Sequence, residues 1–297
     1  MKKYILLFCA ALISSTSLRA QDDLLDLLRE DENTIYATNS FKGTRVVNAQ
    51  SMEMLHPGTM DFRILHRFGR VDQGYYQLFG LDQASMRMGF DFGLTKNLMV
   101  GIGRSTTKKE VDGLIKYRLL WQSKGKQNIP VSVIALGGVT VNGLKDAVGN
   151  PAIETTFSRR LAYFYSFIIG RKFNERLSLQ LSPTIVHQNI VANQVSPNTL
   201  YALGWGGRMK LNKRIAFIWD YSHVFNRFPG NVRYNPLSIG LDIETGGHVF
   251  QLHFSNAVGM NERAFIVDNN SNFFRGQVQF GFNLSRVFQL KKQNPLD

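Results

Sequence analysis

The 297-residue chain lacks several features on which other folds depend: it has one cysteine, eight prolines and, after its first 20 residues, no apolar run long enough for a membrane helix. A single cysteine excludes a scaffold held by disulfides. A hydrophobic content of 44% excludes a disordered chain. Because a membrane helix needs about 18 consecutive apolar residues, two classes remain, a secreted β protein and a membrane β-barrel.

Sequence motifs of metal binding, nucleotide binding and hydrolysis are also missing. The six histidines are scattered and show no H-x-x-x-H or H-E-x-x-H spacing. No G-x-S-x-G elbow is present. The Gly101-Ile102-Gly103 stretch lacks the third glycine of a dinucleotide-binding loop and no helix follows it. We therefore expect no cofactor and no metal.

Residues 1–20 have the pattern of a secretory signal, with Lys2 and Lys3 before an apolar stretch and small residues leading to Ala20. Cleavage there removes Cys9 and lowers the net charge from +13 to about +10. The mature protein is then exported, basic and free of cysteine. Export to the cell envelope argues against nucleic acid as the partner of the basic residues.

From Met60 onward, about twelve segments alternate apolar and polar residues with the period of two that is typical of β-strands. In the clearest segment, Met88 and Phe90 share one face while Arg87 and Asp91 share the other. Most segments have about nine to twelve residues, which is the length of a tilted strand across a bilayer. Strands of soluble proteins have only about five or six residues, so the length favours a membrane barrel over a β-sandwich.

The links between these segments alternate in length, which supports the same interpretation. Short links such as 95–97 and 212–214 alternate with long ones such as 69–83. An outer-membrane barrel with both termini in the periplasm has this pattern. The link at 122–129 is longer than a periplasmic turn. We predict an all-β fold, an antiparallel transmembrane β-barrel of about twelve strands over residues 59–288.

Several stretches resemble a bacterial family that is described as a membrane-bound β-barrel domain of unknown function. Among the stretches that carry the resemblance are FKGTRVVN at 41–48, DFRILHRFG at 61–69 and DIETGGHVFQL at 242–252. The resemblance runs from Phe41 to Phe288, nearly the whole mature chain. It implies the barrel fold and the outer membrane, and it implies no activity and no catalytic residues.

The segments that flank the predicted barrel have a different character. Residues 21–58 begin with an acidic, leucine-rich stretch, Asp22–Glu30, which is typical of a short amphipathic helix. The rest of this segment shows no clear period. Two places are open to residues 21–58: the periplasm, where residues 21–40 would bind a partner, or the barrel lumen, as a plug. The chain ends in a polar tail, 289–297.

If the apolar strand faces contact lipid, the opposite faces line a lumen with charges of both signs. The predicted lumen-lining residues are Arg63, Arg67, Arg87, Asp91, Lys116, Arg118, Asp220, Asp242 and Arg275. Buried charges are costly unless they pair, so a structural network of ion pairs is one interpretation. A narrow pore that its arginines bias toward anions is the other.

The function expected from these patterns is a porin-like outer-membrane pore or transporter for a small solute. The alternatives are a closed structural or partner-docking barrel and a barrel lipid hydrolase that uses His253 and Ser255. We disfavour the hydrolase, and any enzyme, because both residues would face the lumen, where a lipid ester does not reach. Basic loop residues are expected to contact either lipopolysaccharide phosphates or solvent: Lys108, Lys109, Lys145, Arg227, Arg233 and Arg263.

Overall fold

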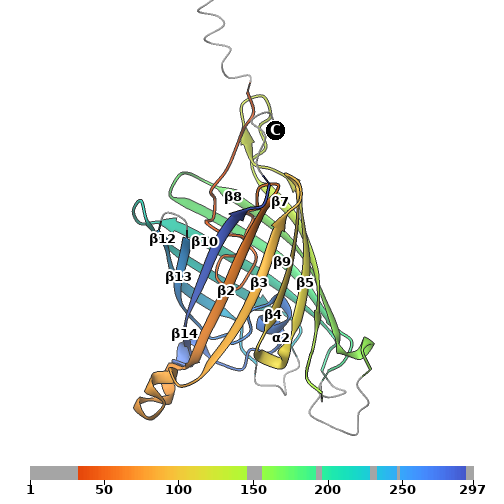
Figure 1. Ribbon diagram of the computed structural model, residues 1–297, viewed down its shortest axis with the longest axis vertical. Helices are drawn as coiled ribbons and strands as arrows, with labels where there is room; N and C mark the ends of the chain where they lie inside the picture. The colour runs from red at the N-terminus through yellow and green to blue at the C-terminus, as the bar shows by residue number, and fades with distance from the viewer. Residues whose placement is uncertain (1–32, 146–155, 192–195, 228–232, 246–247, 292–297) are drawn as a thin grey trace, which may run out of the picture.

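The computed structural model describes residues 33–145, 156–191, 196–227, 233–245 and 248–291 (Figure 1). The predicted signal at 1–20, the predicted helix at Asp22–Glu30 and tail residues 292–297 lie outside the described residues.

Twelve antiparallel strands form a closed barrel, and each is hydrogen-bonded to two neighbours. The strands are β2 (Thr59–Arg70), β3 (Ala84–Gly93), β4 (Leu98–Ser105), β5 (Val111–Leu120), β7 (Ser132–Val141), β8 (Leu161–Lys172), β9 (Leu177–Gln188), β10 (Thr199–Lys210), β11 (Ile215–Val224), β12 (Leu237–Thr245), β13 (His248–Ser255) and β14 (Gln279–Gln289). The barrel closes where β14 pairs with β2, with Leu284 opposite Ile64. The predicted fold class and strand number are confirmed.

Short turns and the end of β14 lie at one end of the barrel, which we call the turn end, and long connections lie at the other, the loop end (Figure 1). Two of the short turns are built alike. The side-chain oxygen of Asn174 accepts hydrogen bonds from the backbone of Arg176 and Leu177, and Asn212 does the same for Arg214 and Ile215. Asparagine favours such turns because its side chain can replace a backbone acceptor.

The loop end carries all the described helical turns. They are η2 (Val71–Gln73), η3 (Tyr75–Gly80), η4 (Thr107–Lys109), η5 (Ser158–Arg160), α2 (Glu262–Val267) and η6 (Phe273–Arg275). None of the helices in the described ranges is both long and apolar enough to cross a membrane.

The unusually long turn-end link at 122–129 has a structural reason. It contains β6 (Ser123–Lys124), which pairs with β1 (Ile35–Tyr36) in a separate two-stranded ribbon. This ribbon stands off the turn end (Figure 1). Trp121 fixes it, since its indole N–H donates to the carbonyl of Ala37 over 2.8 Å and its ring stacks on Tyr36.

Burial alternates along the strands as the sequence period requires. Apolar side chains point outward and remain exposed, for example Ile102 and Phe167, at 52% and 51%. Charged side chains point inward and are buried, for example Arg67 and Lys116, both at 0%. The barrel is therefore apolar outside, and its interior combines charged side chains with apolar ones such as Met99, Ile134 and Phe164.

Residues 40–55, which we call the plug, lie inside the barrel. Phe41, Val46, Val47 and Met52 are almost completely buried there. The chain then leaves the lumen close to the β3 strand, where a Cβ atom on Gly93 would lie 2.1 Å from the carbonyl oxygen of His56. A glycine is required at this point because the two backbones touch.

Candidate functional site: the filled lumen

The wall of the barrel holds the plug mainly through the peptide groups of the plug. On β11, one carboxylate oxygen of Asp220 accepts hydrogen bonds from three consecutive backbone N–H groups, those of Val47, Asn48 and Ala49, over 3.1, 2.7 and 3.1 Å. On β13, two strands away, Gln251 donates to the carbonyl of Val46 over 2.7 Å. These contacts fix the tip of the plug, where Arg45 and Gln50 form an isolated β-bridge.

Three further wall residues hold the two arms of the plug. Gln180 on β9 donates to the Gln50 carbonyl over 2.7 Å and accepts from the Met52 N–H over 3.0 Å. The Lys116 ammonium on β5 donates to the Glu53 carbonyl over 2.6 Å. The Thr44 hydroxyl donates to Asp91 on β3 over 2.8 Å. The plug therefore contacts strands all around the barrel, by hydrogen bonds that are mostly polar side chain to backbone.

The structure places eight of the nine predicted lumen residues inside the barrel, and most have partners. Arg63 binds Asp61 at 2.6 Å, Arg87 binds Asp112 at 2.5 Å, and Arg208 binds Asp242 at 3.4 Å. Arg67 donates to the side-chain oxygen of the plug residue Asn48. Arg118 differs, because no carboxylate within the described ranges comes within 4.0 Å of it.

The placement of Arg275 in the lumen was wrong. Arg275 lies in η6 at the loop end and is exposed. The alternation was extended too far along the chain, because Gly276 adopts a left-handed conformation, with φ of 74°, and ends η6 before β14 begins at Gln279. Inward residues that the prediction left out include Arg208 and Gln180, whose positions in alternating segments were the available signal. Plug residue Arg45 had no such signal.

From the loop end, α2 folds into the mouth of the barrel and contacts the plug. Glu262 on α2 binds Arg45 at 3.1 Å, and both side chains are nearly fully buried. Asn261 caps the helix by accepting a hydrogen bond from the Ala264 N–H over 2.8 Å. The lumen is therefore closed by two segments that touch each other, the plug and α2.

A cluster of charges fixes α2 to the loop end. Arg263 binds Glu110, next to β5, and also Asp268 at 2.5 Å, while Lys108 binds Asp268 at 2.7 Å. Burial raises the pKa of Glu110, and the attraction of Arg263 offsets this only in part. Burial also opposes ionisation of Asp268, but Arg263 and Lys108 outweigh it and lower the pKa of that carboxyl.

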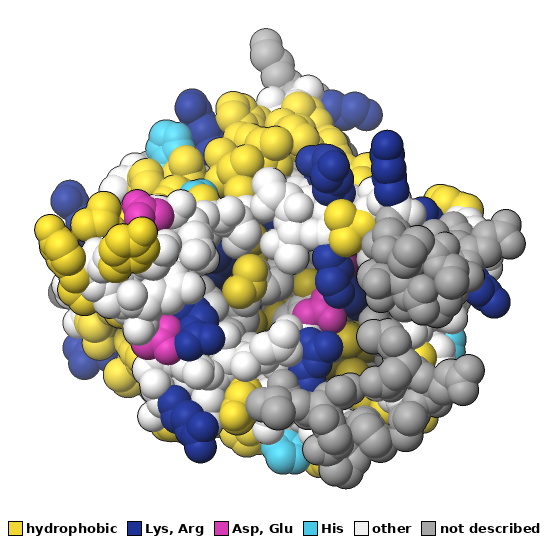
Figure 2. Space-filling model, turned by 90° about the horizontal axis from the view of Figure 1, so that it is seen from below, with side chains coloured by type: hydrophobic (Ala, Val, Ile, Leu, Met, Phe, Trp, Pro, Cys, Tyr) yellow, Lys and Arg dark blue, Asp and Glu magenta, His cyan; other side chains and the backbone are white. Residues whose placement is uncertain are grey.

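Several basic loop residues are used inside the protein. Arg227 donates to the carbonyls of Tyr234 and Ile266 over 2.7 and 2.8 Å, and Arg263 and Lys108 belong to the cluster at α2. Lys and Arg side chains nevertheless surround the mouth when it is viewed from the loop end (Figure 2). The rim of the loop end therefore carries Lys and Arg side chains besides those that bind α2.

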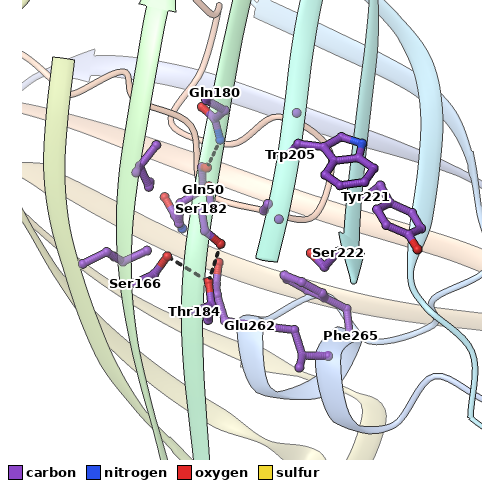
Figure 3. Close-up of a pocket in the computed structure, with 16 residues that line it drawn as sticks. Gln50, Ser166, Gln180, Ser182, Thr184, Trp205, Tyr221, Ser222, Glu262 and Phe265 are labelled. Atoms are coloured by element: carbon purple, nitrogen blue, oxygen red, sulfur yellow. Dashed lines mark hydrogen bonds between the residues drawn. The ribbon is translucent and has the colours of Figure 1, made fainter. Parts of the chain in front are cut away.

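A small cavity remains beside the plug along β8 to β11 (Figure 3). Its volume is about 20 Å³, room for about one water molecule. Small groups line the wall there: Ser166, Ser182, Thr184, Gly204, Gly206 and Ser222. The Ser166 and Thr184 hydroxyls are 2.9 Å apart, and Thr184 donates to the Ser182 carbonyl over 3.1 Å. Phe265 of α2 and Gln50 of the plug cover this cavity.

A second, larger cavity of about 300 Å³ opens near the turn end, between the plug and the wall. We call it the turn-end cavity. Its lining includes Phe41, Lys42 and Met54 from the plug and its surroundings and Lys96, Arg118 and Trp121 from the wall. Among the described residues, no group of three His, Cys, Asp or Glu side chains could hold a metal ion.

The hydrolase alternative gains no support from the geometry. Ser255 is fully buried, with its hydroxyl bonded to Ser238 at 2.9 Å and to the plug residue Asn48 at 3.3 Å. Neither ring nitrogen of His253 has a hydrogen-bond partner among the described residues. Ser255 therefore lacks the hydrogen-bonded base that a serine nucleophile needs.

Comparisons with known proteins give a family and only weak structural likenesses. No curated protein matches the sequence. A NanC porin in a rhombohedral crystal form is 10% identical, with a TM-score of 0.47 over 78% of this chain and 100% of that one. A KdgM porin is 8% identical, with a TM-score of 0.46 over 77% and 99%. The outer membrane protein Omp33 of Acinetobacter baumannii is 6% identical, with a TM-score of 0.40 over 77% and 98%.

Nothing about function follows from likenesses at these TM-scores. The family match is stronger, because the sequence model of a family described as "Membrane bound beta barrel domain" matches residues 41–288. This range contains the plug and all twelve strands of the barrel. The chain therefore belongs to this family of membrane-bound β-barrel domains.

Proposed function

We propose that the protein is an outer-membrane barrel that passes small polar solutes when the plug leaves the lumen. The observation that carries this proposal is the polar character of the contact between plug and wall. Asp220, Lys116, Gln180 and Gln251 hold the plug by hydrogen bonds. Water can replace such bonds, so a net contribution of only about 1 kcal/mol each is expected.

The wall beneath the plug carries charged and hydroxyl side chains between apolar ones such as Met99 and Ile134, so water in an empty lumen would contact its polar groups. Arg63 and Arg87 would keep their aspartate partners, whereas Arg67 and Lys116 would lose partners in the plug. The uncovered charge is then positive at these two residues. Asp220 and Asp91 would be uncovered as well, so the uncovered charges nearly cancel and we propose a pore with little charge selectivity.

The predicted signal at 1–20 and the distribution of turns and loops support the proposed orientation. Short turns in such barrels face the periplasm and long loops face outward. The turn end would then be periplasmic and the loop end external. Lipopolysaccharide phosphates are the partners that we propose for the basic side chains at the loop-end rim, of which Lys109 and Lys145 are examples.

Single-channel conductance in a planar bilayer tests the proposal. The mature chain is expected to be closed with rare openings, and a chain that starts at Gly58 is expected to conduct steadily. The mature chain has no cysteine, so a plug lock can be introduced as Val46→Cys with Gly206→Cys. A Cβ atom on Gly206 would lie 3.4 and 3.6 Å from the two Cγ atoms of Val46, so the two side chains would touch, as the partners of a disulfide must.

The locked protein provides its own control. Oxidation should abolish the openings, and reduction of the same sample should restore them. A chain that starts at Gly58, shows the heat-modifiable mobility of a folded barrel and yet stays silent would contradict the proposal.

A closed, partner-docking barrel is the second candidate, and the β1–β6 ribbon favours it. Ile35 is 70% exposed and Tyr36 is 41% exposed on this ribbon, which projects from the turn end. Residues 21–40 would then present it to an envelope protein. Deletion of residues 21–38 leaves the plug in place, so loss of a cross-linked partner together with an unchanged closed state would support this candidate over the pore.

A further inference from the structure

The turn-end cavity combines an apolar surface with positive charge. Its apolar lining is shared between the plug side, with Phe41, Met54 and Leu55, and the barrel, with Trp121 and Val287. Lys42, Lys96 and Arg118 add three cations. The volume of about 300 Å³ lies at the lower end of the range of small-molecule sites, about 300 to 1,000 Å³.

Arg118 is the unusual group in this cavity. Its side chain lies in β5 and is 7% exposed, yet no described carboxylate lies within 4.0 Å of it. It donates one hydrogen bond, to the Lys96 carbonyl over 3.0 Å, and its guanidinium carbon lies 3.8 Å from the ring centre of Trp121. Its Nε has no hydrogen-bond partner within the described ranges.

Three of the other buried arginines of the wall have acids beside them, and the fourth, Arg67, donates to the side-chain oxygens of Asn48 and Asn283. Arg63 has Asp61, Arg87 has Asp112 and Arg208 has Asp242. The two acids that line the turn-end cavity are already engaged: Asp61 binds Arg63, and Glu53 accepts hydrogen bonds from the Ser40 and Phe41 N–H groups. Glu53 attracts Arg118 across the cavity but makes no ion-pair contact with it within 4.0 Å. Because a desolvated cation without a directly bound counter-charge is costly, an incoming anion would stabilise Arg118.

We propose that the turn-end cavity binds a small amphipathic anion. The carboxylate or phosphate of the ligand pairs with Arg118, and its apolar body lies against Phe41 and Met54. Lys96, which is exposed at the rim, adds attraction at the entrance. The site does not depend on the proposed pore function, since it exists in the closed barrel.

Ligand binding at this site would also act on the plug. The cavity is formed by the plug side and the barrel together, so a ligand that fills it contacts both. A ligand that binds only the assembled form stabilises that form by mass action. The bound anion therefore favours the seated plug.

Tryptophan fluorescence can report binding, because the chain has only three tryptophans. Trp205 and Trp219 point outward from β10 and β11, while Trp121 lines the cavity. The full mature chain with Trp205→Phe and Trp219→Phe, in phosphatidylcholine nanodiscs, is titrated with 3-phenylpropionate. The neutral 3-phenylpropanamide is the matched probe. We expect a saturable change of Trp121 emission with the carboxylate and binding of the amide that is about tenfold weaker or worse.

Variants of Arg118 then test whether the ligand binds at the turn-end cavity. Arg118→Gln should weaken 3-phenylpropionate binding about tenfold or more, and Arg118→Lys should restore most of it. Arg171→Gln is the matched control, because Arg171 is an exposed arginine 5.2 Å from the ring centre of Phe173, outside the cavity. It should bind like the parent.

Three results would overturn the proposal: no saturable change with 3-phenylpropionate, equal affinity for the amide, or equal losses in Arg118→Gln and Arg171→Gln. The comparison of carboxylate with amide uses unchanged Arg118, so it decides the matter even if Arg118→Gln fails to fold.

Discussion

The two sides of the barrel wall fill the lumen in different ways. Strands β2, β3 and β5 point long charged side chains inward, among them Arg63, Arg87 and Lys116. Strands β8 to β10 point small polar side chains inward, among them Ser166 and Ser182, between larger ones such as Phe164, Ile168 and Arg208. On the charged side, Arg63 and Arg87 pair with acids of the wall itself, while Lys116 binds the plug and the turn-end cavity lies beside Asp61 and Arg118. The small side leaves its space to the plug and α2, and the cavity of Figure 3 lies there.

This difference indicates which side of the lumen could open. Retracting the plug and α2 from the small side breaks few bonds of the wall itself. On the charged side, any widening would separate buried ion pairs, which is costly. We therefore expect a solute path to follow β8 to β11.

The largest loss of stability is expected when a buried ion pair on the charged side is broken. Arg87→Ala leaves Asp112 buried without its two hydrogen bonds of 2.9 and 2.5 Å. We expect a loss of about 3 to 5 kcal/mol in the free energy of unfolding, measured by urea denaturation in lipid vesicles. Ser182→Ala on the small side is the control and should cost less than about 1 kcal/mol. Similar losses in both variants would remove the distinction between the two sides.

A second test concerns the anchor of the plug. Asp220→Asn keeps an oxygen acceptor but loses the charge that strengthens three backbone hydrogen bonds. The seating of the plug should weaken by about 2 kcal/mol. The measurement is hydrogen exchange of the Val47, Asn48 and Ala49 amides, which should accelerate while the amides of β3 do not. Unchanged exchange at these three positions would show that Asp220 is not the anchor.

Alanine substitution of one glycine on each side tests the same difference in packing between the two sides. A Cβ atom on Gly103 would lie 2.2 Å from the Arg87 guanidinium, which Asp112 holds in place, whereas one on Gly204 would meet Ser222 and Ser182 at 3.3 and 3.4 Å. Gly103→Ala should therefore cost about 1 to 3 kcal/mol. Gly204→Ala should cost less than about 1 kcal/mol, since its neighbours need to move only slightly. Thermal unfolding of both variants checks the order, and a reversed order would contradict it.

The smallest effect is a pH dependence at α2. The pKa of Asp268 is lowered in the folded protein, so Asp268 contributes stability above its unfolded pKa of about 3.9, and this is lost as the pH falls through the folded value. After correction for the intrinsic exchange rate at each pH, the protection factors of the α2 amides should be lower at pH 3 than at pH 7, by a factor that corresponds to about 1 kcal/mol. Asp268→Asn should remove this acid response.

Glu110 acts in the opposite direction, because its pKa is raised in the folded protein. Its contribution is present at low pH and is lost as the pH rises through the folded value. Glu110→Gln should therefore make the loss of α2 protection on acidification steeper. A shallower response in this variant would contradict the assignment.

Sequence patterns could predict the barrel because side chains in a strand point alternately to its two faces. The polarity of each residue therefore indicates which face it lies on. Thus Arg87 and Asp91 were assigned to the inside from their immediate neighbours alone. The same rule gave a wrong result at Arg275, because the turn at Gly276 interrupts the strand period. It also could not explain the link at 122–129, whose length depends on pairing with a segment far earlier in the chain.

The contacts of the plug could not be predicted in this way. Asn283 donates to the Val47 carbonyl across 236 positions of sequence, and Asp220 binds residues about 170 positions away. The plug segment has no hydrophobic periodicity, so its sequence does not indicate which wall residues it contacts. The lack of a carboxylate within 4.0 Å of Arg118, among the described residues, was equally hidden, since the other arginines on the inward faces look the same in the sequence.

The position of the plug at the beginning of the chain has a consequence for assembly. The plug precedes β2, but its partners come from β3, β5, β9, β11, β13 and β14. These side chains meet only after β14 has paired with β2, and contacts so distant along the chain form slowly because they must close long loops. The segment that is synthesised before every strand of the barrel is therefore the last to reach its native place.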